Sequence, residues 1–256
     1  MPPIHEEFEV DLDGRRLHGS HWQPDNAMAA ALILHGGGCS TSNGLAPLRE
    51  VLYAHGVAST SFDFIGHGKS EGTLIGSSLA ERSAAVAAVI AARRLQPAGM
   101  AVIGFSMGGH IAALAARQHG FSGLGLVIAA AYGAGTGTLH FGPDFANAIR
   151  QPLSWQDSDA FEAVAGFQGH LQIVSAGADA VVPAEIQQRY FAAAERAASR
   201  HHQVISGSPH QLDQHFDLAP QDRTLTYGLL MKLALQSANR AIITDRRPSM
   251  YSQTEP

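Results

Sequence analysis

Short apolar runs recur along this chain, and most of them are followed by a segment of helical composition. Continuous apolar runs of about four to eight residues are typical of strands buried on both faces of a sheet. Strands are expected over residues 30–34, 57–64, 100–105, 125–131 and 171–176, and helices over 45–54, 78–95, 111–118, 184–198 and 220–235. Regular alternation of strands and helices predicts an α/β protein with a mostly parallel sheet and helices on both faces. Functional residues in such a sheet gather at the carboxyl ends of the strands.

The two ends of the chain add three more strands to this pattern. Residues 6–12 and 16–22 alternate apolar and polar side chains around Asp13-Gly14, a turn dipeptide that is favoured in hairpins. A short strand over 203–205 brings the expected sheet to eight strands. Between residues 132 and 169 the regular alternation stops, which indicates an insertion. We therefore expect a single domain over residues 1–256 with a small lid or cap at about 132–169.

Composition and charge exclude several classes of function. The formal net charge is −5 and has no strong block of either sign, so nucleic acid and anionic membrane surfaces are not expected partners. Acidic residues stand near the N-terminus where a signal peptide would be basic, and no apolar run approaches the roughly 18 residues of a membrane span. A cytoplasmic protein is therefore expected. Cys39 is the one cysteine, and no His-x-x-x-His pair occurs, so we expect neither a disulfide nor a metal site.

A serine stands between the predicted strand at 100–105 and the predicted helix at 111–118. Ser106 has Gly104 two residues before it and Gly108 two residues after it. A sharp strand-to-helix turn needs small residues at both positions, because side chains there would collide with the neighbouring strand and helix. Such a turn exposes the serine hydroxyl at the top of the sheet, beside the positive end of a helix dipole. The pattern favours nucleophilic attack by Ser106.

A nucleophilic serine needs a carboxylate that orients its histidine partner. Asp179 follows the expected strand at 171–176 on a short turn before Val182-Pro183, which places a carboxylate at a strand end. A turn or helix-cap aspartate explains the same position equally well. Asp213 and Asp217 are weaker candidates because they lie beside or after the candidate histidines.

The histidine that takes the serine proton is expected after the last strand. His210 lies in a loop whose glycine and proline can aim its ring over the sheet, and His215 is the second choice. His201 and His202 precede or begin the strand and are expected to face solvent. Position at the strand end therefore favours His210 as the general base.

The oxyanion that forms on attack needs two N–H donors, each worth roughly 3 to 4 kcal/mol. The N–H of Met107, directly after the serine, is one. Gly37 is the expected second donor and Gly38 the next choice, because three glycines after the strand at 30–34 let the backbone approach a substrate closely. A phosphate-binding loop is the alternative reading of these glycines, but no Lys-Ser or Lys-Thr follows them.

Five motifs in this order resemble the α/β-hydrolase superfamily. They are His35-Gly36-Gly37-Gly38, the loop 63–70, Gly104-Phe105-Ser106-Met107-Gly108-Gly109, Asp179 before Val182-Pro183, and His210. The likeness spans about residues 6–235 and is greatest to the small-lid branch of monoacylglycerol lipases, feruloyl-type esterases and serine-aminopeptidase-like hydrolases. The resemblance implies a lid at about 132–169, no cofactor, and an acyl-enzyme on Ser106. It also implies that His35, Asp63 and His67 shape the site without being catalytic.

Three functions fit these residues. One is a serine hydrolase that cleaves a carboxylic ester or thioester of a small acyl substrate. A second is an acyltransferase, cyclase or lactonase with the same triad, and a third is a non-catalytic ligand-binding protein on the same fold. The complete set of Ser106, Asp179 and His210 favours the hydrolase, because a binding protein has no physical need for all three. The sequence does not determine the oligomeric state, and a dimer is one possibility.

Several further residues allow two interpretations. Cys39 either contacts the site or is a small buried apolar residue. His110, one turn into the helix after the serine, is expected to pack under the site rather than to react. The aromatic residues of segment 132–169 form either an apolar acyl pocket or the core of the lid.

Overall fold

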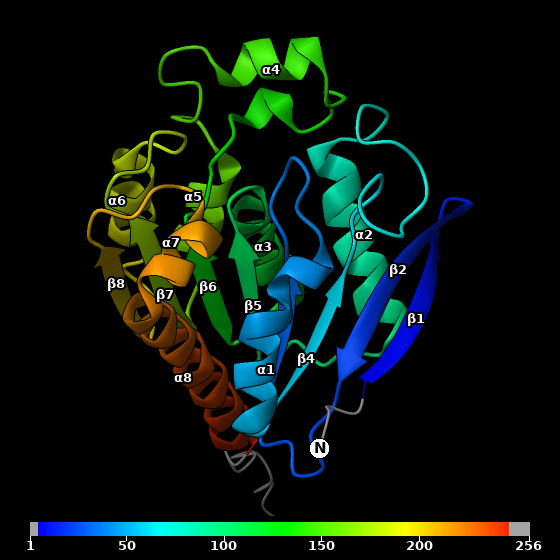
Figure 1. Cartoon of the computed structure of the whole chain (residues 1–256), viewed down its shortest axis with the longest axis vertical. Coiled ribbons are helices and arrows are strands. Elements are labelled where there is room, and N and C mark those ends of the chain that lie inside the picture. Colours follow the sequence, from blue (N-terminus) through cyan, green and yellow to red (C-terminus); the bar gives the residue numbers. More distant parts are fainter. Residues whose placement is uncertain (1–4, 246–256) are drawn as a thin grey trace, which may run out of the picture.

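The computed structural model describes residues 5–245 and contains an eight-stranded sheet (Figure 1). The strands are β1 (His5–Leu12), β2 (Arg15–Trp22), β3 (Ala29–Leu34), β4 (Val57–Phe62), β5 (Met100–Phe105), β6 (Gly123–Val127), β7 (His170–Ala176) and β8 (Ser199–Ile205). Their order across the sheet is β1-β2-β4-β3-β5-β6-β7-β8. The β1–β2 and β2–β4 pairs are antiparallel, and all other neighbours are parallel. The predicted mostly parallel, eight-stranded sheet is confirmed.

The hairpin at the start of the chain forms around the predicted turn. Asp13 and Gly14 have φ angles of 53° and 77°, and Leu12 pairs with Arg15 across the two-residue loop. Left-handed φ at both loop residues is the turn whose twist matches that of the flanking strands, and Asp-Gly is a favoured sequence for it. The predicted hairpin is confirmed.

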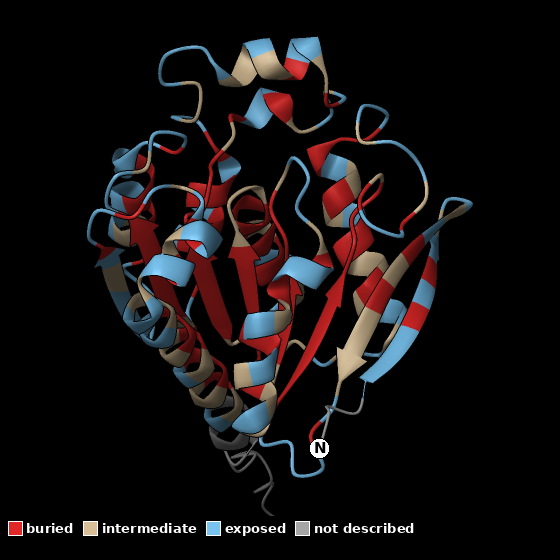
Figure 2. Cartoon of the chain, in the orientation of Figure 1, coloured by how far each residue is buried: buried red, intermediate tan, exposed pale blue. Residues whose placement is uncertain are grey.

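The central strands are apolar on both faces because both faces are covered. In β3, Leu32 and Leu34 pack into the hydrophobic core on one side of the sheet, whereas Ala31 and Ile33 pack into the core on the other. Side chains alternate between the faces of a strand, so a continuous apolar run supplies both cores. Figure 2 shows these strands almost entirely buried.

Helices form a layer on each side of the sheet (Figure 1). The first layer holds α2 (Leu79–Ala92), α3 (Met107–His119), α5 (Asp159–Ala165) and α6 (Ala184–Ala193), and the second holds α1 (Ala46–Ala54), α7 (Leu212–Leu218) and α8 (Pro220–Asp245). Ser78 caps α2, since its hydroxyl accepts from the Glu81 N–H at 3.2 Å. The same hydroxyl lies 3.2 Å from the Glu81 carboxylate, to which it donates. Within residues 5–245 no helix is long and apolar enough to cross a membrane.

Arg49 on α1 is a buried arginine that joins the antiparallel and parallel parts of the sheet. Its guanidinium donates to the hydroxyl and carbonyl oxygens of Ser20 on β2 at 2.7 and 3.0 Å, and to those of Ser59 on β4 at 3.0 and 2.9 Å. The Trp22 ring lies 4.4 Å from its central carbon. Arg49 therefore fixes the edge hairpin against the central strands.

The segment between β6 and β7 contains more structure than its sequence predicts. It includes the short 3₁₀ helix η2 (Ala134–Thr136), α4 (Pro143–Ile149) and α5. α5 packs against α3 and α6 in the helical layer, whereas η2 and α4 stand beyond the carboxyl ends of the strands (Figure 1). Phe145 of α4 has its ring 4.8 Å from that of Phe141 and 5.6 Å from that of Tyr132. These aromatic side chains pack on one another, as the lid-core interpretation expects.

Several predicted boundaries are wrong. β6 ends at Val127 rather than at residue 131, and α6 ends at Ala193 rather than at residue 198. β8 begins at Ser199, four residues before its predicted start at 203, and α8 continues to Asp245 rather than ending at 235. Residues 246–256 lie outside the described residues.

Candidate functional site

Ser106 occupies the turn between β5 and α3 in a backbone conformation that L-residues rarely adopt. Its φ and ψ are 51° and −116°. Hydrogen bonds hold it there, because its N–H donates to the Val127 carbonyl at 2.9 Å and its carbonyl accepts from the N–H groups of Gly109 at 2.9 Å and Ala130 at 3.0 Å. A non-glycine residue at such a φ persists only when its surroundings over-determine it. The surrounding hydrogen bonds therefore hold Ser106 in a strained conformation, which marks it as a candidate functional residue.

The glycines around Ser106 leave no room for side chains. A Cβ on Gly104 would collide with the carbonyl oxygen of Gly108, and a Cβ on Gly108 would collide with the carbonyl oxygens of His35 and Leu34. The expected steric reason for both glycines is thus present in the structure. Their absence of side chains lets α3 approach β3 and β5 closely.

His210 and Asp179 reach the serine from two neighbouring loops. The Ser106 hydroxyl lies 3.0 Å from Nε2 of His210, and Nδ1 of His210 lies 2.8 Å from Oδ2 of Asp179. Both side chains are largely buried, at 14% and 8% exposure. Because a carboxylate only accepts, Nδ1 carries the ring proton and Nε2 presents its lone pair to the serine. The three residues therefore have the geometry of a nucleophile, a base and an orienting acid.

The loops after β7 and β8 hold this arrangement. Oδ1 of Asp179 accepts the N–H groups of Val181 at 2.8 Å and Val182 at 2.9 Å, which leaves Oδ2 for His210. Between the loops, Ala178 donates its N–H to the Ser208 carbonyl at 2.8 Å. The carboxylate is thus fixed by its own turn, and the histidine loop is tied to that turn.

The competing candidates lie elsewhere. His215 pairs with Asp222 at 2.7 Å, and Asp217 pairs with Arg223 at 2.8 Å. Asp213 is exposed on α7. Cys39 is exposed as well, so the interpretation of Cys39 as a buried apolar residue is wrong.

The glycine loop after β3 lies against the serine turn. A Cβ on Gly36 would be 3.4 Å from Cβ of Ser106, and one on Gly37 would be 3.2 Å from Cε of Met107. The two expected oxyanion donors, the N–H groups of Gly37 and Met107, therefore belong to neighbouring segments. His35 supports the loop, since its Nδ1 donates to the Gly36 carbonyl at 2.8 Å and its Nε2 accepts from the Phe64 N–H at 3.0 Å.

Electrostatics favour the neutral form of His35. Its burial, and next the positive charge of Arg82, hold its pKa well below 6.5. Arg82 also donates to the Gly36 carbonyl at 3.3 Å. The sequence reasoning did not select Arg82, although its position between Leu79 and Val86, on the apolar stripe of α2, was a signal of burial.

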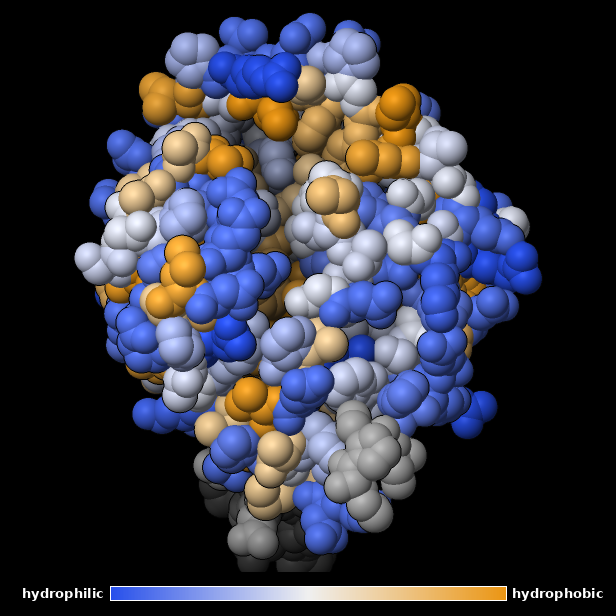
Figure 3. Space-filling model, viewed as in Figure 1, coloured by the Kyte–Doolittle hydropathy of each residue, from blue (hydrophilic) through white to orange (hydrophobic). Residues whose placement is uncertain are grey.

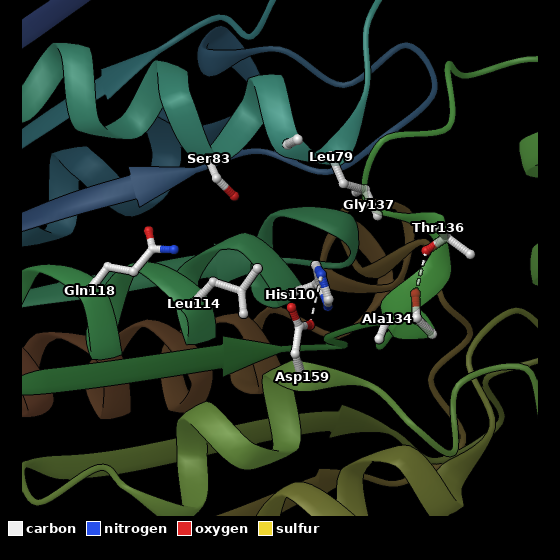
Figure 4. Close-up of a pocket in the computed structure, with 11 residues that line it drawn as sticks. Leu79, Ser83, His110, Leu114, Gln118, Ala134, Thr136, Gly137 and Asp159 are labelled. Carbon is white, nitrogen blue, oxygen red and sulfur yellow. Dashed lines mark hydrogen bonds and ion pairs between the residues drawn. The ribbon is translucent and has the colours of Figure 1, made fainter.

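A separate cavity of about 310 Å³ lies between α2, α3, η2 and the start of α5 (Figure 4). His110 of α3 lines it, with Nε2 3.9 Å from a carboxylate oxygen of Asp159. Burial lowers the pKa of His110 to about 4. Its Nδ1 has no hydrogen-bond partner among the described residues. As expected, His110 packs inside the protein, and it makes no hydrogen bond to Ser106.

No group of three or more His, Cys, Asp and Glu side chains within the described part of the chain could hold a metal ion. Ser106, His210 and Asp179, which follow β5, β8 and β7, form a hydrogen-bonded chain of side chains.

Comparisons with solved structures support the fold. Est1E from Butyrivibrio proteoclasticus with bound ferulic acid has a TM-score of 0.67 and 21% identity, over 88% of this chain and 98% of that one. The esterase Pf2001 from Pyrococcus furiosus has a TM-score of 0.65 and 18% identity, over 91% of this chain and 93% of that one. The thioesterase domain from the curacin biosynthetic pathway has a TM-score of 0.61 and 20% identity, over 87% of this chain and 99% of that one. No curated protein matches the sequence.

The family comparison is more specific than these structural likenesses. A family model described as serine aminopeptidase, S33, matches residues 25–155, slightly more than half of the chain. The matched range contains the glycine loop, the Ser106 turn and α4. The eight-stranded sheet and its helical layers agree with this assignment. The chain therefore belongs to the serine aminopeptidase S33 family, a family of hydrolases within the α/β-hydrolase superfamily.

Proposed function

We propose that this protein is a serine hydrolase that cleaves a carboxylic ester or thioester of a small molecule through an acyl-enzyme on Ser106. The continuous hydrogen-bonded chain from Ser106 through His210 to Asp179 carries the proposal, with its two distances of 3.0 and 2.8 Å. A serine hydroxyl is a weak nucleophile until a base takes its proton, and His210 has its lone pair directed at that hydroxyl.

The reaction proceeds in two halves. As the Ser106 oxygen bonds to the substrate carbonyl carbon, its proton moves to Nε2 of His210, and Asp179 stabilises the resulting imidazolium. The carbonyl oxygen becomes an oxyanion that accepts from the N–H groups of Met107 and Gly37. Collapse breaks the bond to the alcohol or thiol, which leaves with the proton from His210. Water then repeats the steps on the acyl-enzyme, releasing the acid and free Ser106.

The segment at 132–169 is proposed as the lid of this site, within a single domain. Its η2 and α4 stand beyond the carboxyl ends of the strands, at the end of the sheet that holds Ser106 (Figure 1). In the space-filling view the molecule is hollowed beneath α4, and hydrophobic side chains gather around the hollow (Figure 3). An apolar hollow suits a small acyl substrate.

The test replaces Ser106 by alanine and measures turnover of short nitrophenyl esters and thioesters. Ser106→Ala is expected to reduce kcat by about 10⁴-fold or more while the protein stays folded, because the attacking oxygen is gone. Ser206→Ala, at an exposed serine in the loop after β8, is the matched control and should keep full activity. Turnover that survives in Ser106→Ala would refute the proposal.

Two further measurements separate the alternatives. Competing amine and alcohol acceptors are added during turnover, and products that carry the acceptor instead of water would identify a transferase. A fluorophosphonate probe is expected to label Ser106 in the wild type and not in Ser106→Ala. A wild type that remains unlabelled and turns over none of the esters would instead be a binding protein.

A further inference from the structure

Arg82 on α2 is a buried cation without an anionic partner. Its side chain is 1% exposed, and no carboxylate of residues 5–245 lies within ion-pair distance of its guanidinium. A buried charge is costly unless paired, so an unpaired one that is retained calls for an explanation. The arginine lies directly beneath the glycine loop, next to the proposed oxyanion site.

The contacts of Arg82 hold its charge in place without neutralising it. Its guanidinium carbon is 4.5 Å from the Phe64 ring and 5.1 Å from the Phe141 ring. One terminal nitrogen lies 3.2 Å from Nε2 of His67, whose Nδ1 donates to the Ile65 carbonyl at 3.1 Å, so Nε2 is the acceptor. Burial, and next the charge of Arg82, lower the pKa of His67, which keeps that ring neutral. The positive charge is therefore uncompensated.

The remaining terminal nitrogen of Arg82 acts on the oxyanion loop. It donates to the Gly36 carbonyl at 3.3 Å, the same oxygen that accepts from Nδ1 of His35 at 2.8 Å. In a trans peptide the carbonyl and the following N–H point in opposite directions. Because Arg82 and His35 hold the Gly36 oxygen, the Gly37 N–H of the same peptide points away from these two side chains. Gly37 lies beside Met107, whose N–H is the other proposed donor.

We propose that Arg82 is a positioning residue for the oxyanion hole, which fixes the Gly36–Gly37 peptide so that the Gly37 N–H faces the reacting carbonyl, and whose unpaired charge favours the oxyanion. This inference rests on the proposed hydrolase function. The burial of Arg82 makes both effects strong, because little water screens them. Substrate binding before attack does not depend on either effect.

The chain contains a matched control for this proposal. Arg49 is also buried, at 2% exposure, and pairs with no carboxylate of residues 5–245. It donates hydrogen bonds to Ser20 on β2 and Ser59 on β4, and its guanidinium lies over the Trp22 ring. Arg82→Met and Arg49→Met both remove a buried guanidinium while keeping an unbranched side chain. Arg82→Lys keeps the charge and shortens its reach. Kinetics with a nitrophenyl ester, Tm, and Ki for a boronic acid, which forms a tetrahedral anion on serine, are measured for all three.

Arg82→Met is expected to lower kcat by about 100-fold with KM within twofold, since misplacing one oxyanion donor affects the transition state and not the bound substrate. Arg82→Lys is expected to lower kcat by about tenfold. The boronic acid Ki should rise in proportion to the loss of kcat. Arg49→Met should lower Tm while kcat and Ki stay within about twofold of the wild type, as expected for a purely structural arginine.

The outcomes separate the role of Arg82 from the proposed function. If Ser106→Ala still turns over the ester at the wild-type rate, both the hydrolase mechanism and the role of Arg82 are refuted. Turnover that depends on Ser106 but is unchanged by Arg82→Lys and Arg82→Met refutes the role of Arg82 alone. A rise in KM that accounts for the whole loss also refutes it. If Arg82→Met does not fold, the kcat and boronic acid Ki of Arg82→Lys decide the question.

Discussion

At the scale of single residues, the two carboxylate oxygens of Asp179 have different partners. Oδ1 accepts two backbone N–H groups, from Val181 and Val182, and Oδ2 accepts from Nδ1 of His210. Neither backbone group can do anything but donate. The turn therefore fixes which atom of the side chain faces the histidine, and with it the tautomer of the ring.

Asp179→Asn should consequently invert the tautomer of His210. The amide oxygen must take the place of Oδ1, because only an oxygen accepts from Val181 and Val182, and the NH₂ group then faces Nδ1 of His210. Nδ1 becomes an acceptor, Nε2 carries the proton, and the ring can no longer take the proton of Ser106. We expect kcat for a nitrophenyl ester to fall by about 10⁴-fold with little change in Tm.

Asp217→Asn is the control, since Asp217 is an exposed carboxylate that pairs with Arg223 at 2.8 Å. It should leave kcat unchanged. A loss of less than tenfold in Asp179→Asn would contradict the assignment of Asp179 as the orienting acid.

The residues of the candidate site differ in how far the sequence could predict them. Ser106, Asp179 and His210 each follow a strand, so their meeting at one edge of the sheet is a consequence of parallel strands. Arg82 lies at no strand end, and its place on the apolar stripe of α2 is a weaker signal, because an arginine in an alanine-rich helix is usually solvated. Its burial depends on Phe64 and Phe141, which only the tertiary structure brings to it.

At the scale of elements, two glycines inside helices have opposite surroundings. Gly108 in α3 faces the backbone of β3, where a Cβ would collide with the carbonyl oxygens of His35 and Leu34. Gly228 in α8 has no atom within 4 Å of the place its Cβ would take. Helix propensity favours alanine over glycine at both positions, so only packing distinguishes them.

Gly108→Ala is expected to destabilise the protein by about 3 kcal/mol or more, because backbone atoms cannot move aside as a flexible side chain can. Gly228→Ala is expected to stabilise it by up to about 1 kcal/mol. Urea unfolding measures both changes. Equal effects of the two substitutions would show that α3 does not approach β3 as closely as described.

The predicted boundaries of β6 and β8 are wrong because tertiary contacts override the local sequence pattern there. The apolar residues after Val127 suggest a longer strand, yet Ile128 has a φ of 45° and Ala130 donates to the Ser106 carbonyl, so this stretch supports the serine turn instead. β8 begins earlier than predicted because it is an edge strand whose first residues are polar and exposed. Its pairing with β7, and not an apolar pattern, defines it.

At the scale of the whole molecule, buried neutral histidines make stability depend on pH. Burial lowers the pKa of His110 from the usual 6.5 to about 4, and burial also lowers those of His35 and His67. The folded state thus binds fewer protons than the unfolded state as the pH falls from about 6.5 towards 4. These histidines therefore destabilise the fold progressively on acidification, and the full stability is present above pH 6.5.

His110→Leu should flatten this dependence. For a pKa that changes from 6.5 to about 4 on folding, linkage gives a loss of about 2 kcal/mol between pH 7 and pH 5, which the variant would not show. Asp159 next to His110 has a raised pKa, caused first by its burial, and contributes with the opposite sign. The Asp159 side chain is half exposed, and its partial desolvation largely persists in the variant, so most of its contribution cancels when the two proteins are compared.

Urea unfolding at pH 7 and pH 5 measures the difference, with His55→Leu, at an exposed histidine, as the control. At pH 7 His110→Leu should be at least as stable as the wild type, because it removes a buried Nδ1 that has no partner. Its ester turnover should be unchanged, since His110 packs below the proposed site. A variant that loses as much stability on acidification as the wild type would show that His110 is protonated in the folded protein, with the Asp159 carboxylate as its nearest counter-charge.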